Sequence, residues 1–159
     1  MDAYLTILLV IHVLGAIAGI GPTFAFAIIG PNAGRAGPSG GAVLLSTLLD
    51  IEKKIVTPVV LFTQPLTGAL MIFKVGYDDG FFGRTWLWLS IVLYLIILYL
   101  SFIVDQPAIH RVVKWMQSEP QGPPPPEVQK DIGTANKLGP ILTILTVGIA
   151  IMMVWKPGN

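Results

Sequence analysis

Residues 86–104 read WLWLSIVLYLIILYLSFIV and contain no charged side chain. A helix of this length, at about 1.5 Å of rise per residue, extends for roughly 28 Å, which is close to the thickness of the hydrocarbon core of a bilayer. A helix also satisfies its backbone polar groups within the segment, as lipid requires. This stretch therefore predicts a membrane-spanning helix.

Three further stretches of the same kind lie elsewhere in the chain. They comprise residues 4–29, 55–73 and 138–155, and none contains Asp, Glu, Lys or Arg. The composition agrees, because 53% of the 159 residues are hydrophobic and only 12% are charged, which is less charge than a soluble domain carries. We therefore expect an all-α integral membrane protein, a four-helix bundle formed by a single domain over residues 1–159.

The basic residues predict the orientation of this bundle. Three lie on the side of the termini, namely Lys74, Arg84 and Lys156. Seven lie on the other side, namely Arg35, Lys53, Lys54, Arg111, Lys114, Lys130 and Lys137. Because loops rich in Lys and Arg stay in the cytoplasm, we expect both termini to be extracytoplasmic and residues 30–54 and 105–137 to form cytoplasmic loops. Gly30-Pro31-Asn32 predicts the end of the first helix, and residues 119–126 predict a stiff proline-rich linker.

Several classes of function are disfavoured by composition. The chain has no cysteine, which excludes disulfides, iron–sulfur clusters and thiolate chemistry. Its net charge of +1 gives no reason to expect a nucleic-acid partner, so the lipid bilayer is the partner that we expect. The carboxylates lie outside the four stretches or at their edges, and Asp50, Glu52 and Asp105 approach the cytoplasmic boundary but go no deeper, which disfavours a proton pump. No set of catalytic residues is recognisable, and we assign no enzymatic reaction.

His12 is the one histidine within the apolar stretches. Gly15 and Gly19 follow it at i+3 and i+7 and share its helix face. One interpretation is a flat macrocycle that lies on the glycines while the imidazole binds its iron. The other is a small-residue surface for close helix packing, with the histidine hydrogen-bonded across the bundle. The residues alone favour the packing interpretation.

Polar side chains of the four stretches lie at a common depth. At 1.5 Å per residue from the terminal side, one from each stretch comes out at roughly 12–14 Å: His12, Gln64, Tyr94 and Thr146. Pro65 cannot donate to the carbonyl of Leu61, so the second helix is expected to be irregular here. The pattern fits a ligand pocket and a structural polar network equally well.

Three short motifs carry a resemblance to a known family. They are LLVIHVLGA at residues 8–16, QPLTG at 64–68 and WLWLS at 86–90. The chain resembles an uncharacterised bacterial family of four-helix integral membrane proteins (domain of unknown function 2269), which is related to copper-resistance D-like and, distantly, HemJ-like proteins. The resemblance implies a multi-pass protein of the inner (cytoplasmic) membrane. In HemJ-like relatives the histidine that matches His12 is associated with haem b, but their Tyr-Leu-Pro-Arg type of sequence is absent here, so oxidase activity is not implied.

Three hypotheses for function follow. The leading one is a b-type haem bound through His12 as the metal ligand, for electron transfer or redox sensing. Gly15 and Gly19 would form its bed, with Gln64 and Tyr94 beside it. The second is a non-catalytic subunit of a homo-oligomer or larger membrane complex, in which the polar layer is structural. The third is a small-molecule or metal permease.

Overall fold

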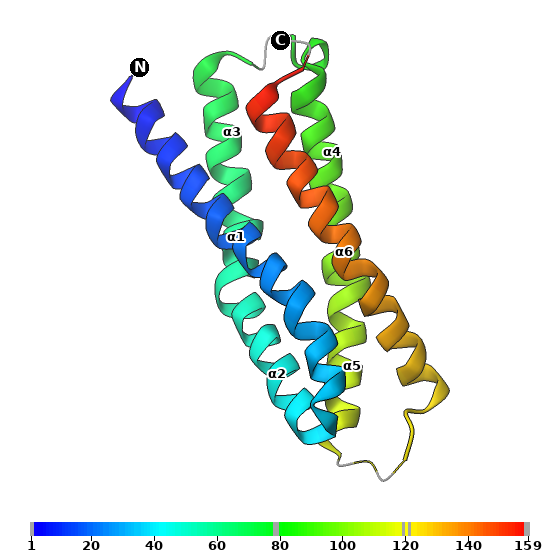
Figure 1. Ribbon diagram of the computed structural model, residues 1–159. Helices are drawn as coiled ribbons and strands as arrows, with labels where there is room; N and C mark the ends of the chain where they lie inside the picture. The colour runs from blue at the N-terminus through cyan, green and yellow to red at the C-terminus, as the bar shows by residue number, and fades with distance from the viewer. Residues whose placement is uncertain (1, 78–79, 119, 121, 158–159) are drawn as a thin grey trace.

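The computed structural model describes residues 2–77, 80–118, 120 and 122–157, and these residues form four long helical segments and no strand (Figure 1). The segments are Ala3–Arg35, Gly37–Val75, Thr85–Gln117 and Pro126–Trp155. Each is long and apolar enough to cross a membrane. Both termini lie at the same end of the bundle (Figure 1), as an even number of spans requires. The predicted all-α, four-helix membrane fold is confirmed.

The first and fourth segments are single helices, α1 (Ala3–Arg35) and α6 (Pro126–Trp155). The second consists of α2 (Gly37–Ile51), η1 (Glu52–Val56), η2 (Val59–Thr63) and α3 (Gln64–Val75). The third consists of α4 (Thr85–Tyr99), η4 (Leu100–Asp105) and α5 (Gln106–Gln117), and a short 3-10 turn, η3 (Phe81–Gly83), precedes it. We call the end with the termini the terminal end. The opposite end, which carries the seven basic residues, is the basic end.

The turns η1, η2 and η4 are π-helical, and each is followed by a residue and then a proline. The residue before the proline donates its N–H to the carbonyl five residues back, in the pairs Thr57–Glu52, Gln64–Val59 and Gln106–Ser101. A proline within a helix has no N–H, and its ring collides with the carbonyl four residues earlier. Widening the preceding turn by one residue accommodates that ring, so the three wide turns are a local consequence of Pro58, Pro65 and Pro107.

The first helix ends later than Gly30-Pro31-Asn32 predicts. It continues to Arg35 with Pro22 and Pro31 inside it, and its last turns pack against α2. The chain reverses at Gly37, whose φ of 73° lies in the left-handed region that glycine adopts without strain. Packing between α1 and α2 thus overrides the local breaker sequence, and residues 30–35 continue the first helix.

The proline-rich stretch 119–126 is partly described by the structure. Residues 119 and 121 of the predicted linker lie outside the described residues. Residue 120 and residues 122–125 are not helical, and α6 begins at Pro126, where the fixed φ of proline suits a first helical residue.

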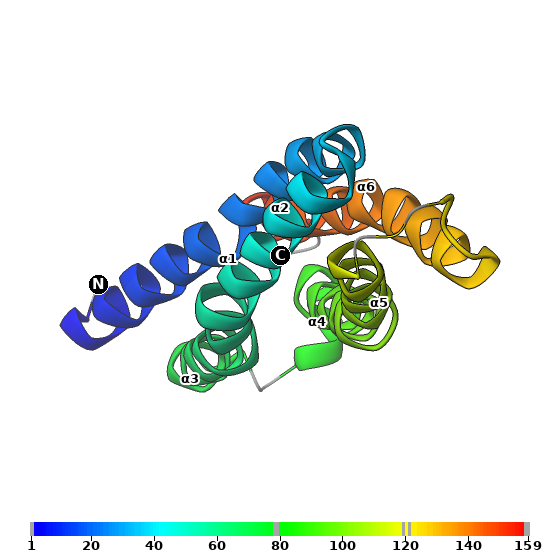
Figure 2. The ribbon, with the colours of Figure 1, turned by 90° about the horizontal axis from the view of Figure 1, so that it is seen from below.

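Most of the buried apolar side chains lie at the basic end, where α1, α2, α5 and α6 meet. They are Ala33, Ala42, Leu48, Ala108, Val112, Val113 and Met116. Within the membrane little is buried: 17% of the most apolar window of α1 and 0% of that of α6. Lipid tails are as apolar as leucine, so no hydrophobic force closes helices inside a bilayer. Seen from below, α1 and α6 lean outwards on opposite sides (Figure 2). Small residues and polar bonds must therefore hold the spanning segments together.

Candidate functional site

The side chain of His12 is held by Thr67 on the neighbouring helix. The distance from His12 Nδ1 to Thr67 Oγ1 is 2.8 Å, and the same hydroxyl donates to the carbonyl of Thr63 at 2.6 Å. A hydroxyl has one hydrogen, so Thr67 accepts from the imidazole, and His12 Nδ1 must carry the donated hydrogen. In the neutral ring Nε2 is then unprotonated. Within the described part of the chain, no hydrogen-bond partner faces Nε2.

Gln64 and Gly15 form the second connection between α1 and the second segment. The Gln64 amide donates from Nε2 to the carbonyl of His12 at 2.9 Å. It can do so because residue 15 has no side chain: a Cβ there would lie 2.5 Å from Gln64 Nε2 and 3.3 Å from Thr63 Cγ2. A Cβ at Gly19 would meet Val60 Cγ2 at 3.4 Å. The glycine face of α1 is therefore covered by residues 59–64 and serves as a close-packing surface.

Tyr94 ties the third segment to the same place. Its hydroxyl donates to the carbonyl of Val60. That carbonyl lacks its usual helical donor, because the N–H of Gln64 points to Val59 in the π-helical turn and Pro65 has no N–H. The sequence predicts a freed carbonyl at Leu61. The wide turn also leaves the carbonyl of Val60 without a helical donor.

The polar layer thus joins three helices rather than four. His12, Gln64, Thr67 and Tyr94 bond between segments, as the common depth of His12, Gln64 and Tyr94 allowed. Thr146 on α6 donates instead to the carbonyl of Leu142 in its own helix at 2.7 Å. The fourth helix takes no part in the layer through this residue.

The residues expected around a haem fit it only in part. His12 offers an unprotonated Nε2, which is the form that binds iron. Gly15 and Gly19 offer no flat bed, because the second segment covers them. The amide of Gln64 and the hydroxyl of Tyr94 are engaged with backbone carbonyls. Among the described residues, no group of three or more His, Asp or Glu side chains could hold a metal ion.

A second polar cluster lies towards the basic end and was missed by sequence reasoning. Glu52 is only 8% exposed, and Ser101 Oγ donates to its Oε1 at 3.4 Å. Asp105 lies one turn beyond Ser101, and its Oδ1 is buried with no hydrogen-bond partner among the described residues. The sequence did offer one signal, since Ser101 and Asp105 share a helix face. The sequence predicts Glu52 and Asp105 at the membrane edge, but it does not predict that they belong to one cluster.

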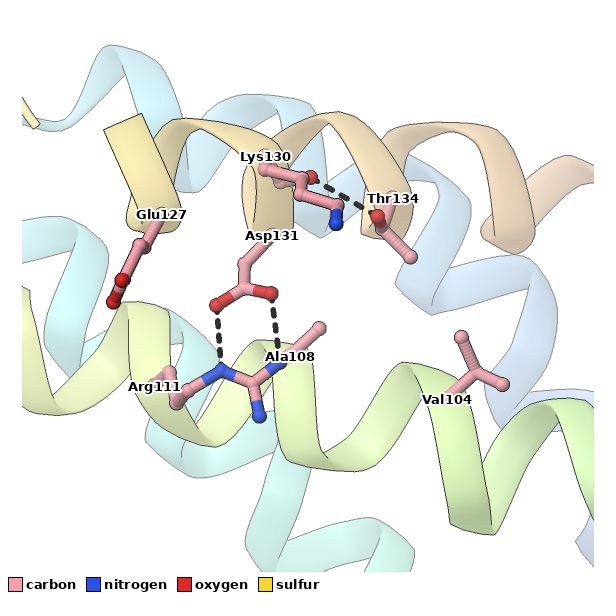
Figure 3. Close-up of a pocket in the computed structure, with 7 residues that line it drawn as sticks. All are labelled: Val104, Ala108, Arg111, Glu127, Lys130, Asp131 and Thr134. Atoms are coloured by element: carbon pink, nitrogen blue, oxygen red, sulfur yellow. Dashed lines mark hydrogen bonds and ion pairs between the residues drawn. The ribbon is translucent and has the colours of Figure 1, made fainter. Parts of the chain in front are cut away.

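A groove with an ion pair separates α5 from the first turns of α6 (Figure 3). Its volume is about 360 Å³, and its lining includes Arg111, Glu127, Lys130 and Asp131. Both oxygens of Asp131 accept from the Arg111 guanidinium at 2.7 Å, as the dashed lines in Figure 3 mark. These hydrogen bonds from Arg111 lower the pKa of the Asp131 carboxyl below its ordinary value. The pair fastens the start of α6 to α5.

This ion pair predicts an acid dependence of stability. A carboxyl with a lowered pKa in the folded state stabilises the fold above its unfolded pKa, and that contribution is lost as pH falls through the folded pKa. Thermal unfolding of the detergent-solubilised protein should therefore show a loss of stability below pH ~4 that Asp131→Asn lacks. Asp50→Asn is the control, because its pair with Lys54 is 66% exposed on the carboxylate side and contributes little. Equal acid sensitivity of wild type and Asp131→Asn would contradict the assignment.

The fold and these polar layers define an integral membrane protein with four spanning helices. Over residues 6–157 the chain matches the family described as predicted integral membrane protein (DUF2269), and it belongs to that family. No curated protein and no solved structure matches it. The relationship to copper-resistance D-like and HemJ-like proteins, the bacterial origin and the inner-membrane location stay predictions.

Proposed function

We propose that this protein is a non-catalytic subunit of a membrane assembly and that it assembles with a second copy of itself through α6. The observation that carries the proposal is the incomplete burial of α6, which packs against α1, α4 and α5. None of its most apolar window is buried within the chain, whereas α1 is packed along its glycine face. Gly139 and Gly148 on α6 have no atom within 4 Å of where a Cβ would stand. Open glycines on a membrane helix permit close approach by another helix.

The polar layer supports this role because it serves the chain's own architecture. Gln64 and Tyr94 bond to backbone carbonyls of neighbouring helices, and Thr67 fixes the His12 ring. These bonds hold the first three segments in one arrangement, and none of them involves α6. The polar side chains that a permease would use are engaged between helices, and no observation favours transport.

A second candidate is favoured by the state of His12. Its Nδ1–H is held by Thr67, which leaves Nε2 able to bind the iron of a b-type haem. The haem would supply a one-electron couple for electron transfer or redox sensing. In this candidate His12 is the metal ligand, and Gly15, Gly19, Gln64 and Tyr94 are not part of the binding site.

Native mass spectrometry of the protein released from lipid nanodiscs tests both candidates. We expect a mass of two chains without haem. Gly148→Trp should return the protein to one chain, because a bulky side chain blocks the approach of α6. Gly21→Trp is the matched control, since Gly21 lies in α1 and is equally open. A single-chain mass for the wild type would overturn the assembly. An added haem mass that is lost in His12→Ala would support the second candidate instead.

A further inference from the structure

The contact between the second and third segments towards the basic end contains two carboxylates from different helices. Glu52, in η1, is buried, and Ser101 in η4 is its hydrogen-bond donor at the long distance of 3.4 Å. The side chain of Gln106, the residue after Asp105, also interacts with Glu52. Asp105 ends η4, and its buried Oδ1 has no partner in the described part of the chain. Each carboxylate lies in a π-helical turn, and such turns often occur at functional sites.

Among the described residues, no Lys, Arg or His side chain forms an ion pair with Glu52 or Asp105. The charged side chain that interacts electrostatically with Asp105 is Glu52. In the part of the chain that the structure describes, no charged side chain of α4, α5 or α6, the helices that pack against η4, interacts with Asp105 in the same way. From α5, His110 acts on Glu52, but its own side chain is exposed. From α2, Asp50 is paired with Lys54 on the exposed face of that segment. The helix α1, which packs against η1, contributes no charged group to either carboxylate within the described residues.

We propose that Glu52 and Asp105 hold a single proton between them at neutral pH. Ser101 bonds to Glu52, and Asp105, with its buried Oδ1, lies one turn beyond Ser101. Two neighbouring carboxylates in a largely buried contact cannot both be ionised without a large cost, and sharing one proton removes one of the two charges. The proton also turns one carboxyl into a donor, which gives the unpartnered oxygen of Asp105 a role in a hydrogen bond. The proton comes from water and returns to it, so no other reactant is needed.

The shared proton makes this contact a pH-sensitive joint between the second and third segments. The pair titrates as a unit rather than as two separate groups. When the pH is raised and the proton leaves, two like charges remain in a buried place, and the helices that carry them repel each other. The folded state binds a proton here that the unfolded chain has released, so stability falls as the pH rises. This behaviour is independent of the assembly proposed above.

Infrared spectroscopy of the purified protein at neutral pH tests the proposal. We expect the carbonyl stretch of one protonated carboxylic acid, identified by its shift in heavy water. Asp105→Asn should remove this band, and so should Glu52→Gln, because either amide frees the remaining carboxyl to ionise. Asp131→Asn should leave it, since Asp131 is paired with Arg111. In the wild type, the band should disappear as the pH is raised.

Two results would overturn the proposal. Absence of the band in the wild type would mean that both carboxylates are ionised, and this result needs no variant to fold. Survival of the band in one of the two amide variants would mean that a single buried acid is protonated by itself. Circular dichroism of each variant shows that its helices are retained before its spectrum is interpreted.

Discussion

Replacing Gly41 by alanine is expected to destabilise the protein more than any other glycine-to-alanine replacement, and the effect falls on the basic end of the bundle. A Cβ at Gly41 would lie 2.5 Å from the carbonyl oxygen of Ala33 and 3.1 Å from Met116 Sδ. The nearest atom belongs to the backbone of α1, which cannot turn aside as a side chain can. Overpacking of this kind costs about 1 to 3 kcal/mol, and the better helix propensity of alanine offsets up to about 1 kcal/mol of it.

The measurement is the unfolding free energy in mixed micelles, followed by circular dichroism. Gly133→Ala is the matched control, because Gly133 lies inside α6 and has no atom within 4 Å of where a Cβ would stand. The control should be as stable as the wild type or slightly more stable. If Gly41→Ala were as stable as Gly133→Ala, the close packing of α2 on the end of α1 would be wrong.

Replacing Gly15 by alanine is expected to have the second largest effect, and inside the membrane. The added Cβ would meet Gln64 Nε2 at 2.5 Å, so the amide must move away from the carbonyl of His12. The lost hydrogen bond costs about 0.6 to 1.7 kcal/mol in a membrane helix bundle, and the Thr63 methyl group at 3.3 Å adds a smaller steric cost. Gly21→Ala, in the same helix and in open space, should show neither cost in the same unfolding assay.

The fold could be predicted from the sequence because a bilayer allows an uncharged stretch of this length only one stable form, the helix. Uncharged stretches such as residues 86–104 have one stable form in lipid, and counting them gives the number of spans. The end of the first helix could not be predicted in the same way. Gly30 and Pro31 are local breakers, and they were overridden by the packing of the last turns of α1 on α2, the next helix, which local propensity does not record.

The depth of the polar layer could be predicted from the sequence, but the hydrogen-bond partners of its residues could not. A constant rise per residue places His12, Gln64 and Tyr94 at one level. Which side chains meet also depends on how each helix is rotated about its axis, and packing sets that rotation. Thr146 illustrates the difference, because the same rise predicts that depth for it and yet it donates to its own helix, as threonine commonly does.

The Glu52–Asp105 pair depends on a further feature that hydropathy does not record. Its two members lie beyond the apolar stretches, so their burial follows from how α2 and α5 continue and pack past the membrane. The wide turns before Pro58 and Pro107 also change the rotation of the chain that follows them. The prolines are visible in the sequence, but the rotation that they produce is not.

A double-mutant cycle between Gly15 and Gln64 tests most directly whether the polar layer holds the first helix to the second. Unfolding free energies are measured for Gly15→Ala, Gln64→Ala and the double variant. If the Gln64 amide lies over Gly15, the alanine at 15 should cost about 1 kcal/mol less when residue 64 is already alanine. Additive costs, within about 0.3 kcal/mol, would show that the two residues do not interact and would contradict a structural layer at His12.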